Sequence, residues 1–319
     1  MRIARSKRPG AVRGTGGGLA ALVLAGLLAL AGAGCADDAD AGTSTADAGS
    51  DGSTDDTAET IAAEQAALLQ APFLLIAHRG GRKLWPEHTR VAYDGAVALG
   101  VDLIEYDVHA TADGVLVVMH DATVDRTTDG SGAIKKMTWA QLSQLDAAHA
   151  FTTDGGKTFP YRGKGVRIPR LDELLDSYPG VALSIEIKQY DPPIVEPVVA
   201  LLEQKGAIGR TILSAFSDPT IQAVRARRPD LLTSLGLGET LTFFAMSEAE
   251  AAAYQPPAPF VQPEDKQVDA ALVARCHAAG LKMQVWTVND AARMQALLDL
   301  GVDGMFTDDP KTLKGLLKP

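Results

Sequence analysis

The sequence predicts a (β/α)8 barrel, a fold in which eight parallel strands alternate with eight helices. Residues 71–319 alternate short apolar runs, which are typical of buried strands, with longer segments of helical periodicity. About eight strands in a segment of this length match the usual size of a single barrel. Polar side chains also stand where several of these strands end, and barrel enzymes carry their catalytic groups there.

The first half of this segment combines apolar runs with a long irregular stretch. Strands are predicted over Leu74–Ala77, Leu103–Val108 and Val115–Met119. A helix is predicted over Thr89–Leu99, because Gly100 follows as a stop signal. Residues 121–168 contain two glycine-rich loop sequences and are expected to form an insertion after the third strand. Long ordered insertions tend to be functional.

The second half repeats the alternation more regularly. Strands are predicted over Val181–Ile187, Thr211–Phe216, Leu231–Leu237, Phe260–Val261, Lys282–Val288 and Gly304–Thr307. Helices are predicted from Leu171 and over Ile194–Gln204, Pro219–Arg227, Thr240–Tyr254, Asp269–Ala279 and Ala291–Leu300. An open doubly wound sheet is the alternative fold, but no Gly-x-Gly-x-x-Gly follows the first strand, which argues against a dinucleotide-binding fold.

The first 70 residues have the composition of an export signal and a tether. A basic start and the short apolar run Leu19–Ala33 predict a signal peptide over residues 1–34, since the run is too short to span a membrane. Cys35 follows a small-residue stretch that resembles a bacterial lipoprotein processing site, although Gly32 stands where Leu is usual. Ordinary cleavage after Ala33 is the alternative. Residues 35–70 are expected to form a disordered acidic tether, because they are rich in small and polar residues.

Charge and cysteine content narrow the class of protein. Residues 71–319 contain 25 basic and 31 acidic side chains, so their net charge is near −6, which argues against nucleic-acid binding. Cys276 is the only cysteine in this segment, and it lies in a helical pattern as a small core residue. The N-terminal signal predicts an exported protein of the cell envelope, either lipid-anchored in the periplasm or outer membrane, or secreted. The sequence does not indicate its oligomeric state.

Three carboxylates at strand ends indicate a metal site. Glu105 and Asp107 are two residues apart on a strand, so their side chains share one face. Glu186, in the apolar run Ser184–Lys188, adds a third carboxylate from another strand. Converging carboxylates repel one another unless a cation lies between them, and oxygen ligands of this kind select Mg²⁺, Ca²⁺ or Mn²⁺.

Two histidines and two fixed cations surround this expected site. His78 and His120 follow apolar runs, and imidazoles titrate near neutrality, so they form a plausible acid/base pair. Arg79 and Lys188 supply positive charge suited to a phosphate. This combination favours substitution at phosphorus over acyl transfer, and no Gly-x-Ser-x-Gly elbow for a serine hydrolase is present.

At this point the motifs resemble the glycerophosphodiester phosphodiesterase family. They occur in that family's order and span residues 74–310. They are His78-Arg79-Gly80-Gly81, Pro86-Glu87-His88-Thr89, Glu105-Tyr106-Asp107-Val108, His120-Asp121, Asp125-Arg126-Thr127-Thr128 with Gly130-Ser131-Gly132, Ile185-Glu186-Ile187-Lys188, Trp286-Thr287-Val288-Asn289 and Thr307-Asp308-Asp309-Pro310.

The resemblance implies a TIM barrel that hydrolyses glycerophosphodiesters to sn-glycerol 3-phosphate and an alcohol, with one divalent cation, Ca²⁺ or Mg²⁺. The site roles that it implies are metal binding by Glu105, Asp107 and Glu186, acid/base catalysis by His78 and His120, phosphate contacts by Arg79 and Lys188, a substrate contact by Trp286 and support by Glu87. His88 departs from the family, which commonly has Asn there, and this puts the polar network beside Glu87 in doubt. His109, His149 and His277 lie outside every motif.

Two other functions and one mechanistic choice stay open. A phospholipase-D-like hydrolase of lysolipids or sphingolipids fits the same motifs, and so does a non-catalytic binding lipoprotein on the same barrel. In the hydrolase, either water or the glycerol 2-hydroxyl attacks phosphorus first, and the second route passes through a cyclic phosphate. The motifs indicate neither the alcohol headgroup nor which histidine is the acid.

Overall fold

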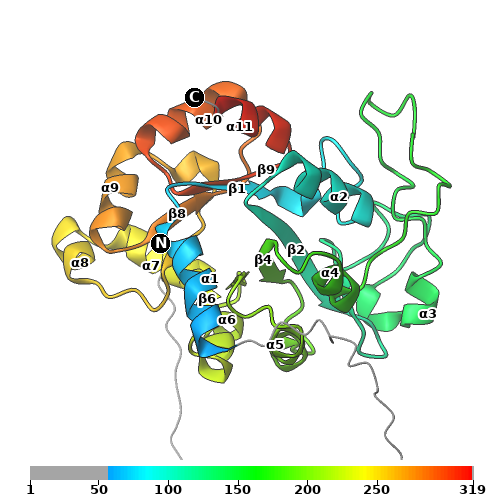
Figure 1. Cartoon of the computed structure of the whole chain (residues 1–319), viewed down its shortest axis with the longest axis horizontal. Helices are drawn as coiled ribbons and strands as arrows, with labels where there is room; N and C mark the ends of the chain where they lie inside the picture. Colours follow the sequence, from blue (N-terminus) through cyan, green and yellow to red (C-terminus); the bar gives the residue numbers. More distant parts are fainter. Residues whose placement is uncertain (1–56, 318–319) are drawn as a thin grey trace, which may run out of the picture. The chain divides into compact units, whose positions relative to one another are not determined.

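A computed structural model of the chain describes residues 57–317 and shows a barrel of parallel strands inside a ring of helices (Figure 1). Hydrogen bonds join the barrel strands in the order β6-β5-β4-β2-β1-β9-β8-β7. A parallel bridge between Ser234 and Phe260 brings the ends of this sheet together, so the barrel is nearly closed. The barrel strands are β1 (Leu74–Ala77), β2 (Leu103–Ala110), β4 (Ala182–Ile187), β5 (Thr211–Ser214), β6 (Leu232–Thr233), β7 (Phe260–Val261), β8 (Lys282–Val285) and β9 (Gly304–Thr307).

The predicted fold class, a (β/α)8 barrel, is confirmed. The α-helices in the described part are α1 (Ala58–Gln70), α2 (Arg90–Leu99), α3 (Trp139–Leu142), α4 (Leu171–Ser177), α5 (Val195–Gln204), α6 (Asp218–Arg227), α7 (Leu237–Ala245), α8 (Glu248–Ala253), α9 (Ala270–Ala278), α10 (Ala291–Leu300) and α11 (Pro310–Leu316). The single helix expected over Thr240–Tyr254 is two helices, α7 and α8, because Ser247 caps a new helix. The strand expected over Leu231–Leu237 is only β6, since α7 begins at Leu237.

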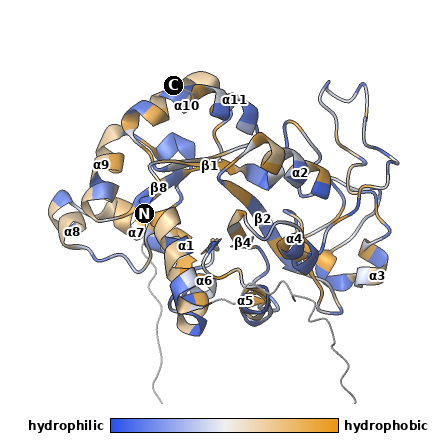
Figure 2. Cartoon of the chain, in the orientation of Figure 1, coloured by the Kyte–Doolittle hydropathy of each residue, from blue (hydrophilic) through white to orange (hydrophobic). Residues whose placement is uncertain are grey.

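The core lies on both sides of the strands. One cluster of buried apolar residues fills the barrel: Leu68, Leu74, Ile76, Leu103, Ile212, Leu232, Phe260 and Phe306. The intervening residues, such as Leu75 and Ile104, belong to clusters that pack against the outer helices. Figure 2 shows hydrophobic residues along β2 and β4, while the outer helices carry both hydrophobic and hydrophilic residues. This alternation decides which side chains face the barrel axis where the strands end.

The third apolar run forms a strand that lies outside the barrel. β3 (Leu116–Val118) pairs antiparallel with β2, so the two strands make a hairpin. The expectation that His120 ends a barrel strand is therefore wrong, and the hairpin carries this histidine instead. Residues 121–168 form the expected insertion, which contains α3 and has a small apolar core of its own.

Part of the segment predicted to be a disordered tether, residues 35–70, is a helix. Residues 58–70 form α1, whose first turn is capped by Thr57, and its Ile61 and Leu68 are buried. Gln65 donates a hydrogen bond to the carbonyl of Asp230, which precedes β6. The predicted signal peptide, Cys35 and the rest of the tether lie outside the described residues. Within the described range, no helix is long and apolar enough to cross a membrane.

Candidate active site

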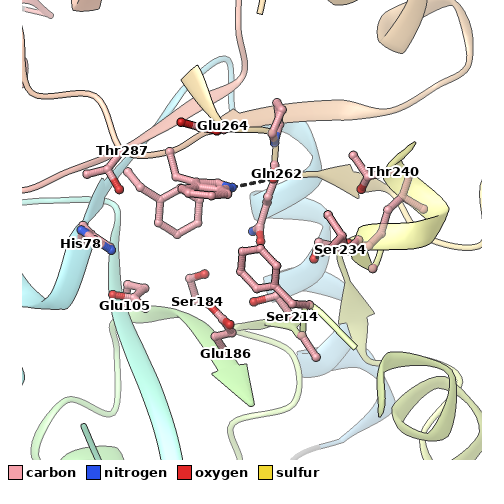
Figure 3. Close-up of a pocket in the computed structure, with 18 of the residues that line it drawn as sticks. His78, Glu105, Ser184, Glu186, Ser214, Ser234, Thr240, Gln262, Glu264 and Thr287 are labelled. Carbon is pink, nitrogen blue, oxygen red and sulfur yellow. Dashed lines mark hydrogen bonds between the residues drawn. The ribbon is translucent and has the colours of Figure 1, made fainter. Parts of the chain in front are cut away.

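The carboxyl ends of the barrel strands surround a cavity of about 230 Å³. Side chains of β2 and β4 and of the segment after β1 line one half of it, and these residues are mostly charged (Figure 3). The predicted site residues that line this cavity are His78, Arg79, Glu105, His120, Glu186, Lys188 and Trp286. The structure therefore brings together residues that are more than 200 positions apart in the chain.

The carboxylates meet because of strand register. Glu105 pairs with Ser184 and Asp107 with Glu186 across the parallel strands β2 and β4. Glu105 and Asp107 are almost fully buried, with 4 % and 1 % of their surfaces exposed. Lys188 lies 2.7 Å from Glu186 Oε2 and 3.2 Å from Asp107 Oδ1, so one ammonium group bridges two of the acids.

Burial changes the pKa values of the three carboxyl groups. It raises the pKa of Glu105 well above its ordinary range and that of Glu186 to about 7, with repulsion from Asp107 adding to both. Burial also acts to raise the pKa of Asp107, but the hydrogen bond to His88 and nearby positive charges hold it well below its ordinary range. Asp107 is thus ionised, whereas Glu105 and Glu186 hold a proton more readily than ordinary carboxyl groups do.

The cluster fits a divalent cation. Glu186 Oε1 is buried and makes no hydrogen bond within the described part of the chain, and Asp107 Oδ1 has only the ion pair with Lys188, so both oxygens are suited to bind a metal. Ligand atoms of His88, Glu105 and Asp107 lie within 4.8 Å of one another. Glu186 is not in this tightest group and joins the cluster through Lys188.

His88 was not predicted as a site residue, but it holds Asp107 in place. Its Nε2 lies 2.7 Å from Asp107 Oδ2, and its Nδ1 lies 2.6 Å from the hydroxyl of Tyr93. Tyr93 in turn donates to the carbonyl of Glu105, 3.2 Å away. Burial lowers the pKa of His88, while the contact with Asp107 acts to raise it. The backbone of His88 is left-handed, with φ +53°, a conformation in which Asn and His are enriched.

Each predicted acid/base histidine is oriented by an aspartate. His78 Nδ1 lies 2.6 Å from Asp308 Oδ1, and His120 Nδ1 lies 2.6 Å from Asp121 Oδ1. Both contacts use Nδ1, which leaves Nε2 as the nitrogen for proton exchange. Burial lowers the pKa of His120 to about 4, although Asp107 and Asp121 counteract it.

Arg79 and Glu87 link the cluster to the insertion. The backbone N–H of Arg79 donates to Glu105 Oε2 at 2.6 Å, and the Arg79 guanidinium lies 3.1 Å from Glu87. Glu87 also accepts two 2.7 Å hydrogen bonds from Arg126. These positive groups lower the pKa of Glu87 to about 2 against the effect of burial. The supporting role expected for Glu87 stays a prediction.

Comparison with known proteins decides the family. The sequence profile of the Glycerophosphoryl diester phosphodiesterase family matches residues 78–312, most of the described body. The chain belongs to this family. The predictions that it resembles these enzymes and is a phosphoric diester hydrolase are confirmed.

Curated relatives in the family cover nearly the same body. A glycerophosphodiester phosphodiesterase of Caldanaerobacter subterraneus subsp. tengcongensis is 36% identical over 254 residues, which cover 77% of this chain and 98% of the relative. One from Bacillus subtilis is 34% identical over 250 residues, covering 74% of this chain and 84% of the relative.

Solved structures of the family share the fold. The glycerophosphoryl diester phosphodiesterase domain of Rv2277c from Mycobacterium tuberculosis is 26% identical, with a TM-score of 0.68, and covers 76% of this chain and 97% of that one. An Oleispira antarctica phosphodiesterase, in complex with the product sn-glycerol-3-phosphate, is also 26% identical, with a TM-score of 0.64, and covers 76% of this chain and 95% of that one.

The other half of the phosphodiesterase cavity is largely uncharged. Trp286 donates from its indole to the carbonyl of Gln262 at 2.7 Å, and its ring meets that of Phe216 edge to face. Hydroxyls of Ser184, Ser214, Ser234 and Thr240 lie around this aromatic pair. The cavity therefore has a charged end suited to a phosphate and a neutral end suited to carbon and hydroxyl groups.

Sequence reasoning missed several residues of this phosphodiesterase site. Asp308 and Asp121 orient the histidines, Arg82 Nε lies 2.8 Å from Asp308, and His88 holds Asp107. Asp121 and Asp308 lie inside motifs already singled out, but only Asp121 stands beside its histidine in the sequence, which was the available signal. A second signal is the alternation of inward-facing and outward-facing residues along β9. Phe306 lies inside the barrel, and Asp308 follows two positions later, so its side chain is expected on the same side.

Proposed function

We propose that this phosphodiesterase hydrolyses glycerophosphodiesters to sn-glycerol 3-phosphate and an alcohol, with a divalent cation and two histidines. The observation that carries the proposal is the charged end of the cavity. There, Glu105 and Glu186, two aspartate-held imidazoles and two basic side chains line the cavity, and Lys188 links them to the buried Asp107. The names of the relatives and the product bound to the Oleispira antarctica structure support the same substrate class.

The carboxylates are suited to hold the cation. Glu105, Asp107 and Glu186 supply oxygen donors of the kind that Ca²⁺ and Mg²⁺ prefer, and the structure favours neither ion. When bound, such an ion polarises the phosphoryl oxygens. Arg79 and Lys188 contribute fixed positive charge beside it, which favours the binding of a phosphodiester anion.

The two histidines divide the proton transfers. One accepts the proton of the attacking hydroxyl, which belongs to water or to the glycerol 2-hydroxyl, while the oxygen forms a new bond to phosphorus. The other donates a proton to the oxygen of the leaving alcohol as its bond to phosphorus breaks. Asp308 and Asp121 stabilise whichever ring becomes positively charged, because each lies 2.6 Å from Nδ1.

Hydrolysis of glycerophosphocholine tests this function. His78→Ala and His120→Ala should each lower kcat by about 100-fold or more, since each removes an acid or base. A chelator should abolish activity, and added Ca²⁺ or Mg²⁺ should restore it. His149→Ala is the matched control, because His149 does not line the cavity. Activity that survives both histidine changes and chelation would contradict the proposal.

We also propose that the chain is exported and lipid-anchored at Cys35. The basic start, the short apolar run and the acidic tether support this localisation. In this arrangement the barrel acts in the cell envelope on small diesters.

A further inference from the structure

His120 differs from the other proposed site residues in where the fold carries it. His78 directly follows β1, and Glu105 and Asp107 lie on β2, so the barrel sheet fixes their backbone. His120 instead follows the hairpin strand β3, and the N–H of Met119 donates the preceding backbone hydrogen bond, to Asp107 at 2.8 Å. Within the described residues, no backbone-to-backbone hydrogen bond involves His120 itself, so its position depends on side chains.

A buried histidine of β2 holds the backbone of His120. His109 is 4% exposed, and its Nε2 lies 3.2 Å from the carbonyl oxygen of His120. Because a carbonyl only accepts hydrogen bonds, Nε2 carries a proton and donates it to this contact. His109 lies two residues after Asp107 on the same strand, so the two side chains leave it on the same side. The strand that carries a proposed metal ligand therefore also fixes the chain at His120.

Arg126 holds the ring of His120 through Asp121. Asp121 Oδ1 lies 2.6 Å from the Nδ1 of His120, and its Oδ2 accepts a 2.6 Å hydrogen bond from the Nε of Arg126. Burial acts to raise the pKa of Asp121, but the hydrogen bonds with Arg126 and His120 hold it below its ordinary value. Asp121 therefore contacts the imidazole as a carboxylate.

The same guanidinium also reaches the barrel. Its two terminal nitrogens donate to the two oxygens of Glu87, each at 2.7 Å, and Glu87 accepts a further 3.1 Å hydrogen bond from Arg79. A guanidinium holds its donors in a rigid plane, so one arginine binds two carboxylates at once, which the compact ammonium of lysine does not reproduce. Arg126 thus ties Asp121, on the insertion, to Glu87, in the segment before α2.

Both of these side chains lie behind His120 and outside the cavity. Arg126 is 44% exposed and His109 is buried, and neither lines the cavity, whereas His120 does. Contacts of this kind orient a catalytic group without touching the reacting atoms.

We propose that Arg126 and His109 are positioning residues that hold His120 where it exchanges protons with the substrate. The inference rests on the proposed two-histidine hydrolysis. His109 fixes the backbone, and Arg126 fixes Asp121 and, through it, the ring. Removal of either contact lets the Nε2 of His120 move, and a displacement of about 1 Å is enough to slow a reaction step about 100-fold.

Hydrolysis of glycerophosphocholine by Arg126→Ala tests the first assignment. The kcat should fall about 10- to 100-fold, because the ring of His120 is no longer held. The KM should change little, because Arg126 does not line the cavity. Arg126→Lys should recover only part of the loss, since an ammonium does not bind Asp121 and both oxygens of Glu87 together.

Arg167→Ala is the matched control for Arg126. Arg167 is an exposed arginine of the same insertion, and its guanidinium donates to the carbonyl of Leu145 at 3.3 Å, away from the cavity. This variant should leave kcat unchanged.

A pair of variants tests the second assignment. His109→Gln keeps an amide N–H that can donate to the carbonyl of His120, whereas His109→Leu has no donor. His109→Gln should therefore lose less kcat than His109→Leu. Urea denaturation of both variants gives the folded fraction at which the two rates are compared.

A double-mutant cycle separates positioning from a structural role. If Arg126 acts through His120, then Arg126→Ala should cause no further loss of kcat in a protein that already carries His120→Ala. The residual rate of the His120→Ala protein is measured at high enzyme concentration. If Arg126→Ala only weakened the fold or the binding of substrate, it would lower the rate by the same factor in both backgrounds.

Four results would overturn the proposal, wholly or for one residue. An equal loss in both backgrounds, or an unchanged kcat in Arg126→Ala, would show that Arg126 does not position His120, and the proposed function would stand. Equal losses in His109→Gln and His109→Leu would remove His109 from the assignment. Full activity in His120→Ala would refute the acid/base role of His120 as well, which distinguishes this result from the other three.

Discussion

At the scale of single residues, the site depends on side chains that hold other side chains. His88 fixes the orientation of Asp107, and its contact with Tyr93 extends to the backbone of Glu105. The two aspartates beside His78 and His120 act in the same way. Such outer contacts commonly change metal affinity or activity when they are lost.

The first residue-scale prediction concerns His88. His88→Ala should weaken metal binding about tenfold. It should also lower the free energy of unfolding by about 2 kcal/mol, because Asp107 and Tyr93 each lose a buried partner. His88→Asn should lose less, since an amide can still bond to one of the two. Titration calorimetry with Ca²⁺ and Mn²⁺, and urea denaturation, measure both effects.

His277→Ala is the control for this prediction, because His277 is an exposed histidine whose ring contacts Asp303 away from the cavity. Unchanged metal affinity in His88→Ala would show that His88 does not position Asp107.

The second residue-scale prediction concerns pH. The pKa of Glu186 is raised to about 7, so at pH 6 this acid holds a proton that a cation must displace. Metal affinity should therefore rise with pH up to about 7 to 8, and binding at pH 6 should release roughly one proton more than at pH 8.5. Titration calorimetry in two buffers with different ionisation enthalpies measures this release.

Glu186→Gln cannot ionise, so it should remove this pH-dependent release. Equal proton release at the two pH values in the unaltered protein would contradict the shifted pKa of Glu186.

At the scale of elements, the sequence alone placed the strands and helices whose residues show a clear apolar periodicity. Strands such as β1 and helices such as α10 were placed within a residue or two, because their apolar patterns and glycine stops are local signals. β3 was recognised as a strand, but its antiparallel partner was not, since pairing depends on contacts that a pattern of apolar residues does not specify. α1 was missed because its alanine-rich sequence resembles the tether before it, and only Ile61 and Leu68 are buried.

The candidate site was predictable for a related reason. Glu105, Asp107 and Glu186 stand out as charges in buried strands, and burial of a charge requires a partner. His88 gave no such signal, because it lies in the turn before α2 and its importance comes only from its distance to Asp107.

At the scale of the whole molecule, one barrel provides both the catalytic end and a closed opposite end. The charged half of the cavity is lined by residues of the first barrel strands, and the largely uncharged half by residues of the later ones. The polar and apolar parts of a substrate are therefore expected to contact different halves of the barrel. None of the described helices has the length and hydropathy of a membrane span, and the lipid anchor at Cys35 is a proposal of its own.

The whole-molecule prediction concerns this anchor. Cys35→Ala should move the protein from the membrane fraction to the soluble exported fraction and abolish labelling with a fatty acid analogue, because the acyl chains supply the membrane affinity. Fractionation followed by immunoblotting measures the change, with Cys276→Ala as the control because Cys276 is buried in the barrel domain. A membrane fraction that is unaffected by Cys35→Ala would exclude lipid anchoring at this position.

Helix α1 makes the two ends of the barrel different. It packs on the segments that precede β5 and β6 and against the apolar residues inside the barrel, so it covers the end opposite the cavity. The barrel is therefore covered where its strands begin and carries its cavity where they end, so substrate and both products use the same face of the described body.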